Sequence, residues 1–398
     1  MPANSSSIDV INALTDIAPD SRLADLRSQR PEAAEHAQGS YTALFDPLEP
    51  VGLNPVERFA IALHVATIHE SPETITHFKT RLLACGADPE VVTAAASPAS
   101  PVEVSASIPP RLRAALRHAE LVTRRPVDAT RDDLQLLADA GLATVEIVVL
   151  SQIVAFVSFQ VRVVAALQLL GAGSNPAAAP AGAPAVAASG DALPAATIIR
   201  PSEPLNSPRA FTRAQLEWEP WLMGLDMADA SPSQIAALGA RSSNSAYFRL
   251  LALDAEVLTA RTATDLGIFY TDGGAPRADR ELAAAATSRL NGCVYCASVH
   301  SRRSAQLSER NDDLDRLLDK GVEPGIDLGL DDRWQAIVDL AVDLSRTPST
   351  ATTAHVSRLR TAGLSDLEIL DVAQSAAFFS WANRLMLTLG EPFVPEAS

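Results

Sequence analysis

The feature that most constrains the fold is an internal repeat without gaps. Residues 124–162, "RRPVDATRDDLQLLADAGLATVEIVVLSQIVAFVSFQVR", align with residues 346–384, "RTPSTATTAHVSRLRTAGLSDLEILDVAQSAAFFSWANR", at a constant offset of 222. The matches include Pro126 with Pro348, Gln152 with Gln374 and Arg162 with Arg384. So many matches without an insertion indicate a duplicated domain.

A tract rich in Pro, Ala and Gly separates the two copies. Residues 171–205 have no helical or strand periodicity that would bury one face. At 398 residues the chain is also longer than a usual single domain. We therefore predict a first domain at 1–170, a linker at 171–205 and a second domain at 206–398.

The repeat also indicates the type of secondary structure. Residues 145–170 are rich enough in β-branched side chains to form a strand, but the matching segment is Ala-rich, with apolar residues at positions 369, 372, 376 and 379. Both copies must then be helical, and we predict an all-α bundle in each half. Residues 145–170 carry Glu146, Gln152, Gln160 and Arg162, which favours a buried helix over a membrane span.

The charge balance excludes one class of partner. The formal net charge is −16, and Lys79 and Lys320 are the only lysines. A protein that binds the phosphate backbone of nucleic acid needs the opposite balance. The first ten residues lack the pattern of a signal peptide, so we expect a cytoplasmic protein whose thiols are reduced.

The segment "SRLNGCVYCASVH", residues 288–300, contains two of the three cysteines. Asn291-Gly292 is a turn signal, so one helix is expected to end there and another to begin near Cys293. Cys293, Cys296 and His300 would then lie on one face of the new helix, with Cys293 in its first turn, where the helix dipole favours a thiolate.

An acidic residue precedes the turn at a similar distance. Glu281 lies about 15 Å and His300 about 12 Å from the corner if both segments are helical, at ~1.5 Å per residue. An antiparallel pair of helices would bring the two side chains level. The sequence thus predicts a carboxylate that orients an imidazole, which in turn accepts a proton from a thiol.

Three other interpretations of the motif stay open at this point. The cysteines could be inert core residues, since cysteine is a well-buried residue type. Zinc could use Cys293, Cys296, His300 and Glu281 as a tetrahedral set, although structural zinc sites usually contain more sulfur. A thioredoxin-type site is disfavoured because its Cys-x-x-Cys belongs to a βαβ unit, which the sequence does not show.

The motif resembles the signature of the AhpD-like alkylhydroperoxidases within the carboxymuconolactone decarboxylase superfamily, an all-α fold. The resemblance rests on Glu281, Cys293-Val-Tyr-Cys296 and His300, and on "RADRELAAAATSRLNGCVYCASVH" and "FFSWANRLMLTLGEP", which are similar to the peroxidase-related branch. It covers the second half almost completely and the first half at the level of the fold.

This resemblance implies a redox role for each residue of the motif. Cys296 would attack the peroxide, Cys293 would resolve the sulfenic acid into a disulfide, and His300 with Glu281 would relay the proton. No bound cofactor or metal is implied, but an external dithiol or protein reductant is. Some family members have a second histidine between the cysteines, where this chain has Tyr295.

The first half is expected to be a degenerate copy. If Glu57 occupies the place of Glu281, then His69, Pro72 and Thr76 occupy the places of the cysteines and the histidine. Glu57 with His64, His69 and His77 could instead form a different acid/base site, and an inactive half kept as an interface is the simpler alternative. The remaining Cys85 is most simply a small buried apolar residue.

The sequence thus favours an enzyme that reduces organic or hydrogen peroxides through Cys296 and Cys293. One alternative is a non-catalytic redox sensor or scaffold, and a weaker one is decarboxylase or isomerase chemistry on a lactone or carbon acid. The duplicated halves suggest a pseudo-dimer, and the ring-like assemblies of the family imply a homo-oligomer, for which a trimer of chains is plausible.

Overall fold

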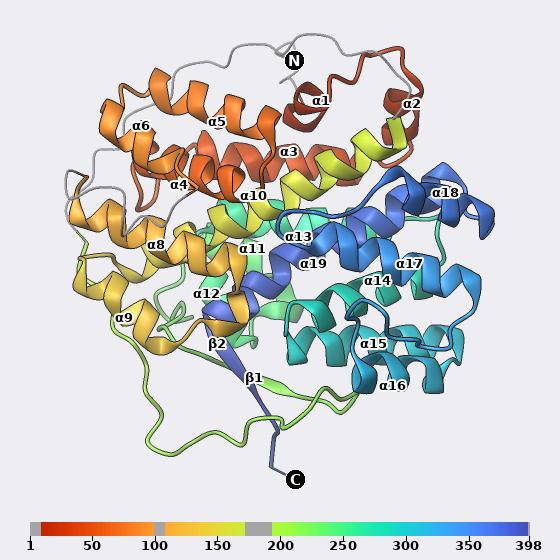
Figure 1. Cartoon of the computed structure of the whole chain (residues 1–398). Coiled ribbons are helices and arrows are strands. Elements are labelled where there is room, and N and C mark those ends of the chain that lie inside the picture. Colours follow the sequence, from red (N-terminus) through yellow and green to blue (C-terminus); the bar gives the residue numbers. More distant parts are fainter. Residues whose placement is uncertain (1–8, 99–107, 172–192, 397–398) are drawn as a thin grey trace.

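The computed structural model describes residues 9–98, 108–171 and 193–396, and these residues form an almost entirely helical structure (Figure 1). The prediction of an all-α fold is confirmed. The short helices at the start of the two halves are α1 (Val10–Leu14), α2 (Arg22–Ser28), α11 (Pro232–Ser242) and α12 (Ala246–Leu251). The remaining helices of the first half are α3 (Pro31–Phe45), α4 (Pro55–Ile68), α5 (Pro72–Ala84), α6 (Pro89–Ala95), α8 (Pro110–Arg124), η1 (Pro126–Asp128), α9 (Arg131–Asp139) and α10 (Thr144–Gly171). Those of the second half are α13 (Ala255–Phe269), α14 (Arg277–Leu290), α15 (Val294–Ser308), α16 (Asn311–Lys320), α17 (Asp332–Ser345), α18 (Thr353–Thr361) and α19 (Asp366–Thr388).

The internal repeat extends well beyond the segment in which it is visible in the sequence. From α4 onward, each α-helix of the first half is separated from its counterpart in the second by the offset of the sequence repeat, so that α4 pairs with α14 and α10 with α19. Side-chain caps stabilise several of these starts. Asn54 and Ser365, for example, each accept a hydrogen bond from the backbone of N3 in a capping box.

The long helices α10 and α19 cross the middle of the molecule and pack on each other (Figure 1). Helix α10 is long and apolar enough to cross a membrane by length and composition, but its most apolar stretch is fully buried within the protein. Trp381 of α19 is also buried, stacks edge-on against Phe156 of α10 at 5.2 Å and donates a hydrogen bond to Gln152 at 2.9 Å. The core therefore runs continuously from one half to the other.

Two buried arginines join the halves reciprocally. Arg162 of α10 donates to the carbonyl of Ser345 at 2.7 Å, and Arg384 of α19 donates to the carbonyl of Thr123 at 2.8 Å. The two donors are separated by the offset of the repeat, and so are the two acceptors. The two contacts are thus reciprocal, because each copy of this arginine donates to the same position in the other copy of the repeat.

A second contact between the halves pairs α3 with α13. Ser40 and Thr264 form a hydrogen bond across it at 3.3 Å. Gly267 permits the close approach, because a Cβ atom there would lie 2.8 Å from the backbone nitrogen of Ala33.

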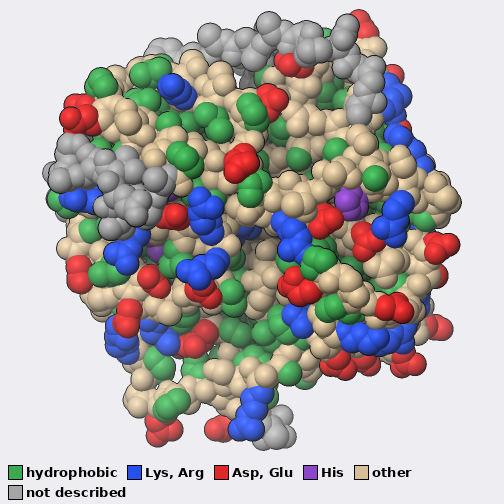
Figure 2. Space-filling model, viewed as in Figure 1, with side chains coloured by type: hydrophobic (Ala, Val, Ile, Leu, Met, Phe, Trp, Pro, Cys, Tyr) green, Lys and Arg blue, Asp and Glu red, His purple; other side chains and the backbone are tan. Residues whose placement is uncertain are grey.

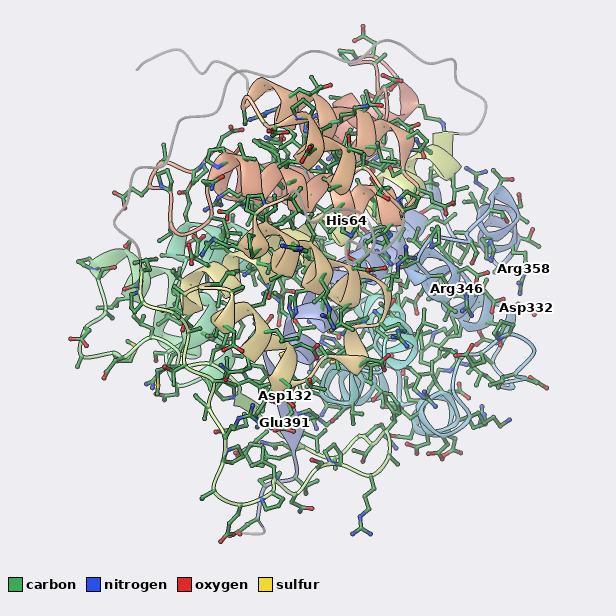
Figure 3. All side chains as sticks on the ribbon, turned by 60° about the vertical axis from the view of Figure 1, so that its left-hand side comes forward. His64, Asp132, Asp332, Arg346, Arg358 and Glu391 are labelled. Atoms are coloured by element: carbon green, nitrogen blue, oxygen red, sulfur yellow. The ribbon has the colours of Figure 1, made fainter. Side chains whose placement is uncertain are left out.

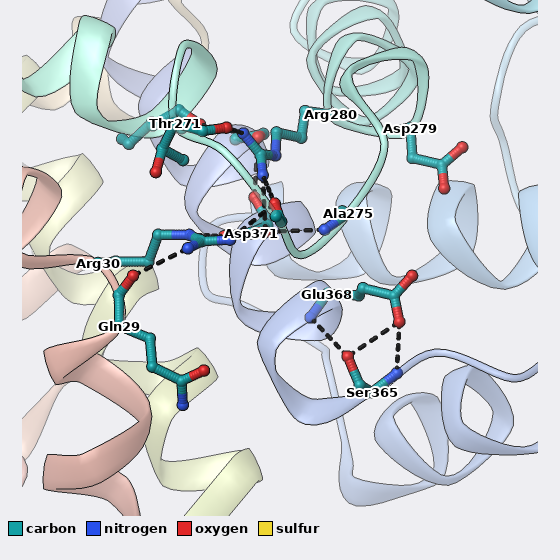
Figure 4. Close-up of polar contacts among 12 residues, drawn as sticks. Gln29, Arg30, Thr271, Ala275, Asp279, Arg280, Ser365, Glu368 and Asp371 are labelled. Carbon is teal, nitrogen blue, oxygen red and sulfur yellow. Dashed lines mark hydrogen bonds and ion pairs between the residues drawn. The ribbon is translucent and has the colours of Figure 1, made fainter.

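A buried carboxylate at the start of α19 gathers groups from both halves (Figure 4). Asp371 accepts two hydrogen bonds from Arg30 of the first half, at 2.7 and 2.8 Å, and one from Arg280 at 3.0 Å. The backbone N–H of Ala275 donates a further bond at 2.9 Å. Such a site is sensitive to the loss of any one partner, since a buried charge would then be left uncompensated.

The only strands in the described part of the chain are β1 (Glu217–Pro220) and β2 (Gly390–Phe393), which pair antiparallel with Glu217 opposite Phe393. Residues 172–192 of the expected linker lie outside the described residues. The rest of that linker, from residue 193, includes a backbone bond from Ala196 to Leu142 and one from Ile199 to Trp221. The boundaries of the two domains remain a prediction.

The surface agrees with the charge balance of the sequence. On the face shown in Figure 2, acidic and basic side chains are interspersed, and no stripe of Lys and Arg crosses it.

Candidate functional site

The two helices that carry the Cys-x-x-Cys motif meet at a tight turn. Helix α14 ends with Asn291 as its C-cap, and Gly292 adopts a left-handed backbone with φ of +80°. A side chain at Gly292 would also collide with Val127, since its Cβ would lie 2.7 Å from that residue. Glycine is therefore required here on two counts. Cys293 follows as the N-cap of α15, one residue earlier than the first turn in which the sequence placed it.

Folding α15 back along α14 brings the predicted acid and base together. The Nδ1 atom of His300 lies 2.5 Å from Oε2 of Glu281, and the Nε atom of Arg277 donates to Oε1 of the same carboxylate at 2.6 Å. Glu281 is 1% exposed, so both of its oxygens are occupied within the protein. The ring of Phe379 packs edge-on against His300 at 4.0 Å and restricts its orientation.

This arrangement assigns a role to each imidazole nitrogen. Because Nδ1 faces a carboxylate, it carries the proton, and Nε2 is left as the acceptor in neutral His300. Burial by itself would lower the pKa of His300, but the Glu281 carboxylate outweighs it and raises that pKa. Conversely, burial opposes the ionisation of Glu281, while His300 and then Arg277 lower the pKa of that residue. The pair therefore favours an imidazolium beside a carboxylate.

The pKa values of the two thiols are shifted in opposite directions. Both are unpaired and nearly inaccessible, Cys293 being 1% and Cys296 5% exposed. Burial and the adjacent Cys296 raise the pKa of Cys293 well above its usual value. Burial also opposes the ionisation of Cys296, but a hydrogen bond from Cys293 and the positive charge of His300 lower the pKa of Cys296 below its usual value. Of the two thiols, Cys296 is therefore the one that loses its proton more readily.

Asn383 is a site residue that sequence reasoning did not identify. Its Nδ2 donates to Ser288 at 3.0 Å, and its Oδ1 accepts from Asn291 at 3.0 Å, so it joins α19 to the turn that holds the cysteines. The Asn383 amide also lies within hydrogen-bonding reach of the thiols and helps to lower the pKa of Cys296. The sequence signal that could have identified Asn383 is its position as a polar residue directly after the largely apolar stretch 376–382. In the structure, Asn383 is buried.

A cavity of about 220 Å³ opens onto the motif from the side of Cys293. Its wall is mostly apolar and includes Trp218, Trp221, Tyr295 and Met386. A cavity of about 710 Å³ lies along α8 and α9, but no cysteine lines it. The smaller cavity thus gives a small molecule access to Cys293.

The zinc interpretation finds no support in the described residues. Nowhere in 9–98, 108–171 or 193–396 do three or more His, Cys, Asp or Glu side chains form a group that could hold a metal ion. The carboxylate of Glu281 is already bonded through both oxygens to His300 and Arg277.

The structure corrects the alignment of the first half. Glu57 is the third residue of α4 and Asp279 the third residue of α14, so Glu57 corresponds to Asp279 and not to Glu281. The contacts agree, because Glu57 pairs with Arg111, the second residue of α8, and Asp279 pairs with Arg333, the second residue of α17. The sequence comparison had matched one carboxylate with another, whereas the helix starts at Pro55 and Arg277 give the register.

The counterparts of the motif are therefore two residues away from those expected. None of His69, Pro72 and Thr76 corresponds to a cysteine or to the histidine of the motif. Phe59 replaces Glu281, Ser71 and Thr74 replace Cys293 and Cys296, and Phe78 replaces His300. These two phenylalanines are fully buried and pack on Phe45, with ring centroids at 5.3 and 5.1 Å. An aromatic cluster thus fills the place of the Glu-His pair.

The alternative acid/base site of the first half is not assembled either. His64 lies among the helices of that half (Figure 3) and contacts the carbonyl of Ala95 at 3.3 Å. His77 bonds to the hydroxyl of Tyr41 at 2.8 Å, whereas Glu57 is bound to Arg111. Burial lowers the pKa of both His64 and His77 to about 4. These residues have separate structural partners.

Cys85 is half-buried at the end of α5 and packs against the core, as expected for a small apolar residue, although it is more accessible than predicted.

Comparison with known proteins finds a family that is similar to the part of the chain containing the motif. The model of the carboxymuconolactone decarboxylase family matches residues 255–327, which run from α13 into the segment after α16. No curated protein matches the chain. Among solved structures, the chain is similar to an alkylhydroperoxidase AhpD core, a peroxidase-related protein from Ralstonia eutropha JMP134, with 22% identity, a TM-score of 0.34 and coverage of 41% of this chain and 85% of the other. It is also similar to a peroxidase-related protein from Silicibacter sp. TM1040, with 24% identity, a TM-score of 0.34 and coverage of 42% and 91%. The segment that carries Glu281, Cys293, Cys296 and His300 therefore lies within the part of the chain that is similar to the carboxymuconolactone decarboxylase family.

Proposed function

We propose that this protein is a thiol oxidoreductase that reduces hydroperoxides through a dithiol-disulfide cycle of Cys296 and Cys293. The observation that carries the proposal is the contact between Glu281 and His300 at 2.5 Å beside two buried thiols, of which Cys296 has the lowered pKa. A thiolate is the reactive form of cysteine, and burial alone would suppress it. The surrounding groups therefore act specifically to keep this sulfur reactive.

The first half of the cycle needs only the groups that the site contains. His300 accepts the proton of Cys296 at Nε2, and Glu281 holds the imidazolium through Nδ1. The thiolate attacks one peroxide oxygen, the O–O bond breaks, and Cys296 becomes a sulfenic acid. The departing alkoxide takes the proton from His300 and leaves as the alcohol. The peroxide is thereby reduced by two electrons.

The second half of the cycle uses the neighbouring thiol. Sulfur of Cys293 attacks the sulfenic sulfur, hydroxide leaves with the proton of Cys293 as water, and a disulfide forms. The hydrogen bond between the two thiols supports this step, because it keeps the sulfurs adjacent. An external dithiol then reduces the disulfide and is itself oxidised to a disulfide. Since Cys293 lines the 220 Å³ cavity, the reductant would reach that sulfur first.

The test is hydroperoxide consumption measured with a panel of dithiol donors, for the wild type and for Cys296→Ser. We expect many turnovers per chain for the wild type and none for the variant. Cys293→Ser should react once and leave a sulfenic acid on Cys296 that a dimedone-type probe captures. Labelling of Cys293 in Cys296→Ser would reverse the assignment of the two roles.

Two outcomes would favour the alternatives. A single oxidation per chain, without turnover in the presence of any donor, would indicate a redox sensor. Activity on a lactone or carbon acid that survives alkylation of both cysteines would indicate decarboxylase or isomerase chemistry. The proposed cycle also requires a reducing compartment such as the cytoplasm, since Cys293 and Cys296 must return to thiols.

A further inference from the structure

Helix α13 contributes a buried guanidinium to the surroundings of the thiols. Arg261 is 4% exposed, and its Nε and Nη1 atoms are buried without a hydrogen-bond partner. Within the described ranges it makes no ion pair with any carboxylate. Burying a cation in this way is costly unless a negative charge forms nearby. The position of Arg261 therefore needs an explanation beyond the stability of the fold.

Two aromatic rings hold this guanidinium next to the site. Its central carbon lies 5.0 Å from the ring centre of Phe378 and 5.8 Å from that of Tyr247. Phe378 packs at 5.9 Å on the ring that restricts the imidazole of the motif. Tyr247 packs edge-on at 5.5 Å against Trp218, in the wall of the cavity beside Cys293. These contacts connect Arg261 with both sides of the thiol pair.

The other ionisable groups on this side do not neutralise Arg261 by direct contact. Asp265, one turn further along α13, is close enough for the two charges to affect each other, but burial raises the pKa of its carboxyl, which therefore gives up its proton less readily. Burial also raises the pKa of Tyr247 to about 12, so its unpartnered hydroxyl stays neutral. The carboxylate of Glu281 is occupied by the imidazole and by Arg277.

The thiol of Cys296 is a place where the missing negative charge can form. Burial opposes its ionisation, whereas the hydrogen bond from Cys293, the charge of His300, the amide of Asn383 and the charge of Arg261 all lower its pKa. Charges in a buried site interact strongly over several ångströms, because little water screens them. Arg261 and the sulfur can therefore stabilise each other without direct contact.

We propose that Arg261 is the permanent counter-charge of the Cys296 thiolate. An imidazolium ceases to be a cation once His300 gives its proton to the departing alkoxide, whereas a guanidinium stays charged at every physiological pH. Arg261 therefore keeps the nucleophile ionised whatever the protonation state of His300. Its part in catalysis rests on the proposed function, but its effect on the acidity of Cys296 is present with or without turnover.

Replacing Arg261 with Met tests this role. Met is unbranched and fills irregular space in a core, and the loss of a buried cation without an ion-pair partner should not unfold the protein. In a Cys85→Ser and Cys293→Ser background, iodoacetamide alkylation of the full chain against pH reports on Cys296 alone. We expect the midpoint of this profile to rise by at least about one pH unit in Arg261→Met. The rate at the alkaline plateau should not fall, because a fully ionised thiol no longer depends on the counter-charge for its ionisation.

Two further variants keep the test decisive. Arg303→Met removes the same charge from an exposed residue of α15, where water screens it, and should leave the midpoint unchanged. Arg261→Gln is a second neutral variant if Arg261→Met fails to fold by circular dichroism. Equal midpoints in the Arg261 and Arg303 variants would overturn the proposal. A lower plateau with an unchanged midpoint would do so too, since it would show that Arg261 only supports the packing around the thiol.

Hydroperoxide consumption by the wild type separates this inference from the proposed function. If the wild type does not turn over any hydroperoxide but the midpoint rises in Arg261→Met, the proposed function fails and the counter-charge stands. If the wild type turns over and the midpoint is unchanged in Arg261→Met, the counter-charge alone is refuted.

Discussion

Replacing Glu281 with Gln tests the central contact of the proposed relay. The wild-type carboxylate accepts from His300 at 2.5 Å and from Arg277 at 2.6 Å. In Glu281→Gln the amide oxygen can still accept from Arg277, but the amide nitrogen then faces Nδ1 of His300. That nitrogen donates, so the imidazole must move its proton to Nε2, and Nε2 can no longer accept the proton of Cys296.

The size of the effect follows from the interactions that are lost. A hydrogen bond to a charged group is worth about 1.5–3 kcal/mol, and the charge that Glu281 provides to His300 is lost in the variant. Since about 1.4 kcal/mol corresponds to a tenfold change in rate, the reaction of Cys296 with peroxide should slow by at least about tenfold. General acid/base assistance as a whole contributes about 100- to 10,000-fold, which sets the upper range.

The variant should also change the acidity of Cys296. The positive charge of His300 helps to lower the pKa of Cys296, and Glu281 raises the pKa of His300. Without that carboxylate the imidazolium is less stable, so the pKa of Cys296 should rise. Iodoacetamide alkylation against pH, in a Cys85→Ser and Cys293→Ser background, measures this shift on a single thiol.

Two matched carboxylates serve as controls. Asp279 lies on the same helix and is buried, but it bonds to Arg333 and to the indole of Trp334. Glu57 is its counterpart in the first half. Asp279→Asn and Glu57→Gln should leave the alkylation profile of Cys296 unchanged in the folded protein. An unchanged profile in Glu281→Gln itself would show that the carboxylate has no part in the reactivity of Cys296.

The other predictions concern the thiols, the packing and the assembly. Because the pKa of Cys296 is lowered and that of Cys293 is raised, peptide mapping after brief alkylation should find Cys296 modified at neutral pH and Cys293 only as the pH increases; the reverse order would contradict the assignment. Asn383→Leu removes an amide that stabilises the Cys296 thiolate, so alkylation at neutral pH should slow by roughly tenfold, and an unchanged rate would remove Asn383 from the site. Gly267→Ala should lower the free energy of unfolding by about 1–3 kcal/mol through steric overlap with α3, whereas Gly39→Ala, whose Cβ would make an ordinary 3.7 Å contact, should raise it by up to about 1 kcal/mol. Light scattering at micromolar concentration should give a multiple of the chain mass, and a strictly monomeric mass would refute the predicted homo-oligomer.

The local features of the fold could be read from the sequence, because they depend on residues near one another along the chain. Helix starts follow from capping residues such as Asn54 and Ser365, and the turn between α14 and α15 follows from Asn291-Gly292. The contact between Glu281 and His300 belongs here too, since a tight turn at Asn291-Gly292 allows α15 to fold back along α14.

Tertiary structure decided the features that depend on side chains far apart in the chain. Asn383 reaches the thiols only because α19 packs on α14, and the cavity beside Cys293 forms only where segments of both halves meet. The degenerate half is the clearest case. The match of Glu57 with Glu281 rested on residue type. Helix register and the ion pair of Glu57 with Arg111 show instead that Phe59 corresponds to Glu281. Packing, and not chemical similarity, determines which side chain faces the core.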